Sequence, residues 1–82
     1  MKPSGTILSP TTIDSFNVKS INLRLADFIK FKVEGQPILG LVSSMERDTI
    51  KTTAGIEVLG YLNDDKIKMP TIPPRPGDFV YH

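Results

Sequence analysis

The stretch DFIKFKVEGQPILGLV, residues 27–42, gives the clearest indication of the fold. Its first half alternates between an apolar face and a face that carries lysines: Ile29, Phe31 and Val33 against Phe28, Lys30 and Lys32. A period of two with one apolar face is typical of a strand that is buried on one side. The residues EGQP, 34–37, then offer a turn, because glycine can adopt positive φ and proline fixes the exit. With the apolar residues that follow, the stretch predicts a β-hairpin.

The same pattern recurs along the chain. Further strands are predicted at GTILS (5–9), SFNVK (15–19), ILGLVSSM (38–45), GIEVLGYL (55–62) and DFVYH (78–82). In the fourth of these, one face is predicted to carry Ile56, Val58 and Gly60, and the other Glu57, Leu59 and Tyr61. Gly40 and Gly60 lie in mid-strand, where glycines mark bulges or bends in a tightly coiled sheet. Residues 21–27 alternate too but also suit a loop, and residues 43–51 hold one turn of helix at most.

These elements predict an all-β domain. About six short strands with frequent turns, and no window with helical periodicity, are typical of that class. With 82 residues the chain forms one domain. A small closed or nearly closed barrel is favoured over a sandwich, because closure removes the strand edges that invite aggregation.

The composition narrows the possible chemistry. The chain has no cysteine and one histidine, His82, which excludes disulfides, cysteine-bound zinc and thiol catalysis. A net charge of +1 favours neither nucleic acids nor membranes as partners. No apolar run approaches the ~20 residues that span a bilayer, and the first residues lack the apolar segment of a signal peptide. We therefore expect a cytoplasmic protein without membrane contact.

No candidate catalytic site stands out. Asp64 and Asp65 are adjacent, so on an extended chain their side chains point apart, which suits a solvated turn better than an acid–base pair. Ser43 and Ser44 have no histidine to activate them except His82, and a nucleophile needs a positioned base. The chain also lacks a glycine-rich phosphate loop with a lysine. We expect that it is not an enzyme by itself and holds no cofactor or metal.

Two features suggest binding. Arg24, Lys30 and Lys32 provide positive charge, and Phe28 could stack on a base beside the two strand lysines. The alternative is an ordinary lysine-protected strand that buries Phe31. The segment PPRP, 73–76, could likewise bind an aromatic-lined groove, or could be a rigid connection that sets the angle of the last strand.

The order of these segments resembles the N-terminal HAS-barrel of HerA-type ATPases of the HerA/FtsK superfamily. The resemblance covers nearly the whole chain, and its most specific parts are ILGLVSS (Ile38–Ser44), VLGYL (Val58–Leu62) and PPRPGDFVY (Pro73–Tyr81). In that family the last motif leads from the barrel to a P-loop ATPase core. One departure is Ala26, where the family often has glycine before the hairpin. A turn that needs positive φ would be less stable with alanine.

The resemblance implies that residues 1–82 form a single β-barrel domain, the N-terminal fragment of a longer hexameric DNA helicase or translocase. ATP and Mg²⁺ would then bind to an ATPase core outside this chain, whose nucleotide motifs the chain lacks. The barrel of such enzymes helps to assemble the ring, and it binds a NurA-type nuclease that acts in the processing of DNA ends. Its partners would be other subunits, that nuclease, and DNA through the ring.

Three hypotheses follow. An assembly and docking module would use apolar or mixed residues that point outward: Phe28, Leu39, Leu41, Leu59, Tyr61 and Arg75. A standalone barrel that binds single-stranded nucleic acid would use Arg24, Lys30 and Lys32. A purely structural barrel of another multidomain protein, such as an elongation-factor-like domain, would have no partner-specific face.

Overall fold

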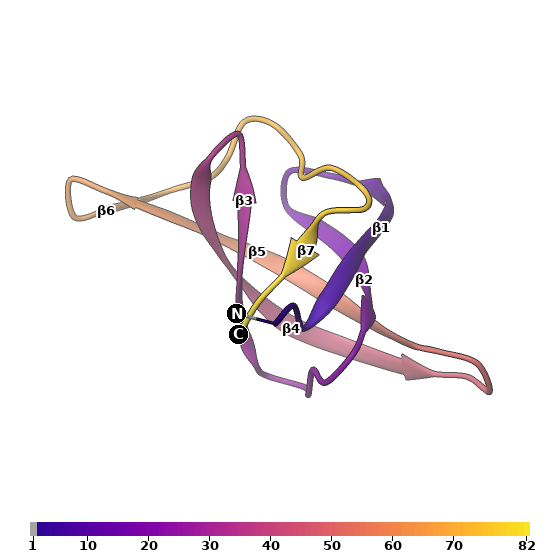
Figure 1. The fold of residues 1–82 in the computed structure, drawn as a ribbon. Coiled ribbons are helices and arrows are strands. Elements are labelled where there is room, and N and C mark those ends of the chain that lie inside the picture. The colour runs from indigo at the N-terminus through magenta and orange to yellow at the C-terminus, as the bar shows by residue number, and fades with distance from the viewer. Residues whose placement is uncertain (1) are drawn as a thin grey trace.

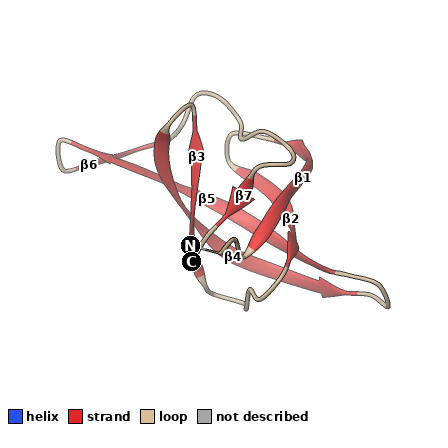
Figure 2. Cartoon of the chain, viewed as in Figure 1, coloured by secondary structure: helices blue, strands red, loops and turns tan. Residues whose placement is uncertain are grey.

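The computed structural model describes residues 2–82, without the side chains of residues 62 and 63. Its strands are β1 (Gly5–Thr11), β2 (Ser15–Ser20), β3 (Phe28–Val33), β4 (Gln36–Arg47), β5 (Thr52–Asn63), β6 (Lys66–Lys68) and β7 (Phe79–Val80). Strands and loops account for the whole of this range, as Figure 2 shows. Within it, therefore, no helix is long and apolar enough to cross a membrane.

The strands form an antiparallel sheet that closes on itself (Figure 1). Neighbouring strands follow the order β3-β4-β5-β2-β1-β7, and β6 pairs with β5 outside this path. The two ends of this order, β3 and β7, meet where Lys30 of β3 and Tyr81, which directly follows β7, exchange two backbone hydrogen bonds, with N–O distances of 2.6 and 2.8 Å. The all-β class and the small, nearly closed barrel are thus confirmed.

The predicted hairpin is β3–β4. Val33 pairs with Gln36 across a two-residue turn, in which Glu34 and Gly35 have φ values of 50° and 80°. Two consecutive positive φ values are the signature of a turn whose twist matches that of the flanking strands. Along β3 the buried and exposed side chains alternate as the sequence predicts.

β4 and β5 form a long ribbon with two bulges. On β5, Leu59 is an extra residue between the pairs Gly40–Val58 and Leu39–Gly60. On β4, Ser43 is an extra residue between the pairs formed by Val42 and Ser44. Bulges bend the strand and increase its twist, which helps a small sheet to close. The β4–β5 turn extends beyond the barrel at one end and the β5–β6 hairpin at the other, which gives the domain extents of 44 × 23 × 21 Å (Figure 1).

The first bulge corrects the predicted faces of β5. Gly60 lies opposite Leu39, whose side chain points outward, rather than on the face of Val58. Tyr61 consequently turns towards the core, against which it packs while half-buried. One extra residue moves every following side chain to the other face of a strand.

Two segments that the sequence left open are now placed. Residues 21–27 form a loop, and residues 43–47 continue β4 instead of a helical turn. The proline segment is part of the fold, because Pro70 and Pro74 are buried and the Thr11 hydroxyl donates a 2.7 Å hydrogen bond to the Pro74 carbonyl. This placement favours the rigid connection over a free proline-rich ligand.

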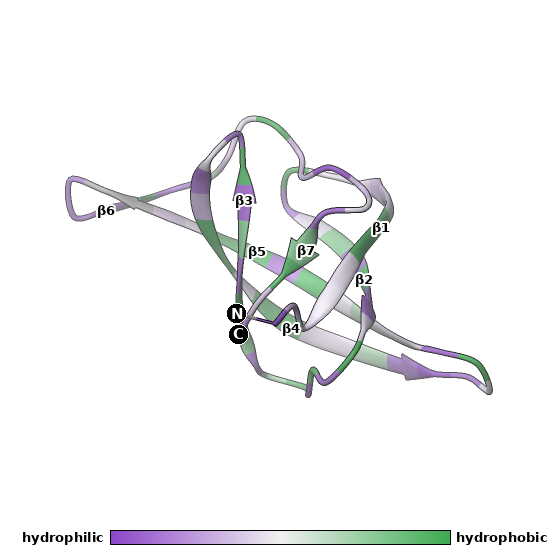
Figure 3. Ribbon diagram, viewed as in Figure 1, coloured by the Kyte–Doolittle hydropathy of each residue, from purple (hydrophilic) through white to green (hydrophobic). Residues whose placement is uncertain are grey.

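The core occupies the inside of the barrel. Its apolar residues come from every strand except β6 and, with Leu23, from the loop before β3. Figure 3 shows the apolar residues of the chain, buried or exposed, as green bands. Phe16 and Phe31 meet edge to face at the centre of the core, with ring centroids 4.9 Å apart and planes at 75°. Such aromatic pairs add about 0.5–1.5 kcal/mol to the burial of their area.

Ala26 adopts a strained backbone conformation that glycine would suit better. Its φ is 71°, and its N–H donates a 2.8 Å hydrogen bond to the Val42 carbonyl. This left-handed conformation costs an alanine about 1–2 kcal/mol. Glycine avoids this cost, but part of the gain is lost because glycine makes the unfolded chain more flexible. Ala26→Gly is therefore expected to raise the free energy of unfolding by about 0.5–1 kcal/mol in urea titrations. An equal or lower stability of the variant would contradict the positive φ.

Candidate interaction surface

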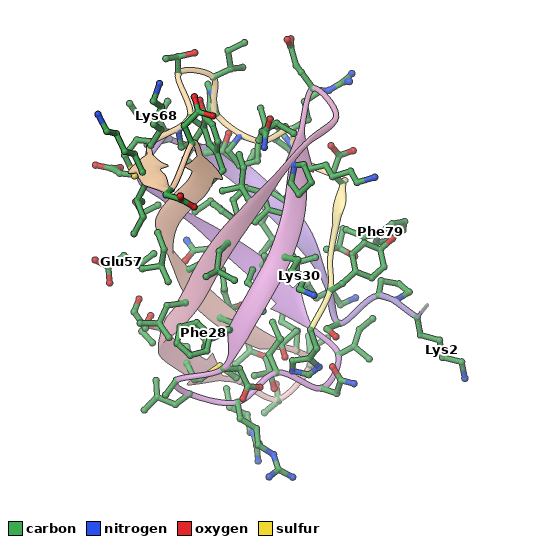
Figure 4. All side chains as sticks on the ribbon, turned by 90° about the vertical axis from the view of Figure 1, so that its left-hand side faces the viewer. Lys2, Phe28, Lys30, Glu57, Lys68 and Phe79 are labelled. Atoms are coloured by element: carbon green, nitrogen blue, oxygen red, sulfur yellow. The ribbon has the colours of Figure 1, made fainter. Side chains whose placement is uncertain are left out.

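The outward side chains of β3 and of the part of β4 that pairs with it form one surface. We call this surface, made by Phe28, Lys30, Lys32, Leu39 and Leu41, the outer face. Phe28 pairs with Leu41, and Lys30 pairs with Leu39. Directly opposed residues on antiparallel strands share a face. Phe28 is 59% exposed and Leu39 is 39% exposed. Figure 4 shows Phe28 and Lys30 along β3, with Glu57 and Lys68 to one side of them.

A groove continues the outer face between β4 and β6. The pairing of β4 with β5 ends at Leu39 and Gly60, and the next residues of β5 pair with β6 instead. The strands separate there and leave a hollow of about 410 Å³. Its walls include Lys30, Pro37, Leu39, Leu59, Tyr61 and Ile67. Lys30 carries the only charge among the residues that line it within the described part of the chain.

The structure brings together most of the residues predicted for protein contact. Leu39, Leu59 and Tyr61 line the groove, and Phe28 and Leu41 lie beside it as a cross-strand pair. Arg75 lies apart from them. It lines a separate hollow of about 330 Å³ next to the proline segment, together with Lys32, Glu34 and Asp78.

The predicted basic residues do not converge either. Lys30 lines the groove, Lys32 lines the hollow beside Arg75, and Arg24 is exposed on the loop before β3. Ile67 was not predicted as a contact residue, but it is 73% exposed and contributes to the groove. Its strand, KIK, has only three residues, too few for a periodic signal.

A second cluster lies at the seam where the barrel closes. His82 Nε2 is 2.9 Å from Asp27 Oδ2, and His82 Nδ1 is 3.2 Å from Ser4 Oγ. Because an ionised carboxylate only accepts, Nε2–H donates to Asp27, and when the ring carries only this proton, Nδ1 accepts from the Ser4 hydroxyl. Asp27 Oδ2 also accepts a 2.8 Å hydrogen bond from the Arg24 N–H.

This Ser–His–Asp line joins three distant parts of the chain but does not offer a nucleophile. Ser4 is 2% exposed, so a substrate has no access to its hydroxyl. From the sequence, Ser43 and Ser44 were the serines weighed as partners of His82, whereas the fold places His82 against Ser4 and Asp27. We infer that these three side chains stabilise the contact between the two edges of the barrel, next to the Lys30–Tyr81 pair.

The seam makes stability depend on pH. The hydrogen bond from His82 and, next, that from the Arg24 backbone lower the pKa of Asp27 below its ordinary value. A carboxyl group whose pKa is lower in the folded state stabilises the fold above its unfolded pKa, and this contribution is lost as the pH falls through the folded pKa. We therefore expect the free energy of unfolding to decrease below about pH 4.

Asp27→Asn removes this titration, so the free energy of unfolding should decrease less steeply as the pH falls below about 4. Urea titrations between about pH 7 and pH 2 measure it. The backbone N–H groups of Ile50 and Lys51 lower the pKa of Asp48, so Asp48 contributes to the same loss of stability at low pH. Asp48→Asn is therefore the matched comparison. An unchanged slope in Asp27→Asn would contradict the seam contact.

Comparison with known proteins gives no family assignment: no family model matches the chain, and no curated protein matches it significantly.

Proposed function

We propose that this chain is a non-catalytic N-terminal assembly and docking module of a HerA-type hexameric ATPase that translocates DNA and takes part in the processing of DNA ends. The outer face with its groove supports the proposal most directly. In this role the barrel contributes to ring assembly and binds a partner nuclease of the NurA type. ATP and Mg²⁺ bind to the ATPase core of the parent protein, which acts in the cytoplasm.

The chemistry of the groove fits a protein partner. Contiguous exposed apolar surface on a small domain marks an interaction site, and apolar anchors in a pocket dominate the energy of such interfaces. Here Leu39, Leu59 and Ile67 line the groove, and Lys30 is the charged residue of its wall. A partner segment with an apolar side chain for the groove and a nearby carboxylate for Lys30 matches this arrangement.

The affinity for the NurA-type nuclease of the same genome, measured by isothermal titration calorimetry, tests the proposal. Leu39→Asp places a charge in the groove wall and should weaken binding by at least about tenfold. Ile50→Asp makes the same chemical change at a position that is 90% exposed on the β4–β5 turn, and it should bind like the wild type. Absence of binding, or equal losses in both variants, would reject the outer face as the docking site.

A second candidate function is the binding of single-stranded nucleic acid. The specific observation in its favour is the exposed ring of Phe28 two residues from Lys30 on the same strand face. Stacking on such a ring contributes about 1–3 kcal/mol per base. Oligonucleotide binding that weakens with salt and with Phe28→Ala would support it. Dissociation constants above about 1 mM at low salt would exclude it.

A further inference from the structure

Aromatic rings lie on the outside of the barrel close to the seam. The chain has four phenylalanines and two tyrosines. Of these, Phe28 is 59% exposed on β3, and Phe79 is 49% exposed on β7. Tyr81, directly after β7, pairs with Lys30 and therefore shares its outward face. Three rings on two adjoining strands are more than the scattered exposed apolar residues of an ordinary surface.

Lysines lie beside these rings on the same side of the sheet. Lys30 and Lys32 point outward from β3, which adjoins β7 at the seam. On the other side of β7, Phe79 pairs with Thr6 of β1, and Thr6 pairs with Lys19 of β2. Residues directly opposite one another in an antiparallel sheet share a face. Phe79 therefore lies between the two lysines of β3 and Lys19.

The rings and lysines together form a surface that we call the seam face. Figure 4 shows Phe28 and Lys30 on β3 and Phe79 on the adjoining strand. The members of the seam face are Lys19, Phe28, Lys30, Lys32, Phe79 and Tyr81.

The charges of the strands are segregated around the barrel. The neighbouring strands β2, β1, β7 and β3 contain three lysines and no acidic residue. The acidic residues within strands, Glu46 and Glu57, lie on β4 and β5. Asp78 directly precedes β7, but it shares the hollow at the proline segment with Arg75 and Lys32. The small net charge of +1 thus conceals one positive side.

We propose that the seam face binds single-stranded DNA, with bases stacked on Phe28, Phe79 and Tyr81 and phosphates beside the lysines. Exposed rings interleaved with positive charge are the usual surface for single strands. Phe79 and Tyr81 are two residues apart, about 7 Å along the chain, so each ring has room for its own base. A duplex fits less well, because its base faces already stack on one another. An apolar protein segment would leave the lysines without partners.

This inference rests on the proposed function for its choice of DNA, and it extends the second candidate function from β3 across the seam. β3 lies between β4, which leads to the groove, and β7. A nuclease in the groove and a strand that crosses β7 would therefore occupy adjoining sites. In this arrangement the barrel holds a DNA end beside the nuclease that processes it.

Fluorescence anisotropy of a labelled oligo-dT of about 16 nucleotides, titrated with the whole chain, tests the inference. We expect a dissociation constant of about 100 µM at low salt, at the weak end for non-specific binding. Three lysines that each neutralise one phosphate predict a slope of about −2 for log K against log salt concentration. Lys32→Gln should reduce this slope by about 0.7, whereas Lys51→Gln, on the β4–β5 turn, should leave it unchanged.

Variants of Phe79 test the stacking. Phe79→Ala should weaken binding at least about fivefold, the lower limit for the loss of one stacked ring. Phe79→Tyr keeps a ring and should bind within about twofold of the wild type. The side chain points outward, so the barrel should remain folded in both variants, and thermal melts verify this.

The outcomes separate the inference from the functions proposed above. It is overturned if folded Phe79→Ala and Lys32→Gln bind like the wild type, even where Phe28→Ala weakens binding and so supports the second candidate function. A dissociation constant above about 1 mM at low salt also overturns it, as does binding of oligo-U RNA more than about tenfold tighter than oligo-dT. The nuclease is absent from these assays, so failure of the docking role does not alter their result.

Discussion

Phe31→Ala is expected to lower the free energy of unfolding by about 3–5 kcal/mol, the range for removing a buried phenylalanine. The ring is almost fully buried and meets the edge of Phe16 in the centre of the barrel. A domain of this size has a total stability of only about 4–12 kcal/mol. The variant should therefore lose much of its folded population, because few neighbouring side chains can close the cavity.

Phe28→Ala is the matched control. It removes the same side chain from the same strand, but Phe28 points outward and is largely exposed. Its effect on stability is expected to remain within about 0.5–1 kcal/mol. Chemical denaturation of both variants, followed by circular dichroism, measures the difference. Equal losses in the two would mean that β3 does not have the observed register.

Gly60→Ala is expected to lower the free energy of unfolding by about 3–4 kcal/mol through two effects. The φ of Gly60 is +117°, a conformation that residues with a Cβ rarely adopt. An added Cβ would also lie 2.5 Å from the backbone carbonyl oxygen of Lys68, on the paired strand β6. Backbone cannot move aside as a flexible side chain can, so β6 should detach and open the groove.

Gly35→Ala separates the two effects. Gly35 also has positive φ, at +80°, but no atom lies within 4 Å of the position of its Cβ. Only the conformational cost of about 1–2 kcal/mol should remain. Hydrogen exchange at the amides of β6 should increase in Gly60→Ala and not in Gly35→Ala. Similar stability losses in both variants would contradict the close approach of β6.

The local parts of the fold were predictable from the sequence. In the β3–β4 hairpin, alternation defines the buried face and Glu34–Gly35 supplies the turn, because all of this information lies within neighbouring residues. Ala26 is a further case. Alanine at this position predicted strain if the turn needs positive φ, and the φ of 71° meets that condition.

The bulges limited what the sequence could predict about the site. Gly40 and Gly60 indicated irregular positions, but a glycine does not reveal which neighbour becomes the extra residue. That residue is Leu59, and it decides that Tyr61 turns inward and that the groove opens beside Leu39. Ile67 remained hidden because its strand is too short for periodicity.

The contacts at the seam could not be predicted from the sequence for a different reason. Ser4, Asp27 and His82 are separated by most of the chain, and no local pattern links them. They meet only because β7 returns to β3 when the barrel closes. Contacts of this kind depend on the topology, which alternation and turn chemistry alone do not determine.

NMR titration can locate the docking surface on this chain residue by residue. Backbone amide chemical shifts of the ¹⁵N-labelled protein would be followed during titration with the NurA-type nuclease. We expect the largest changes on the outer face and its groove, at Phe28, Lys30, Leu39, Leu59 and Ile67. Changes centred on the seam or on residues 43–47, or no changes at saturating nuclease, would contradict this expectation.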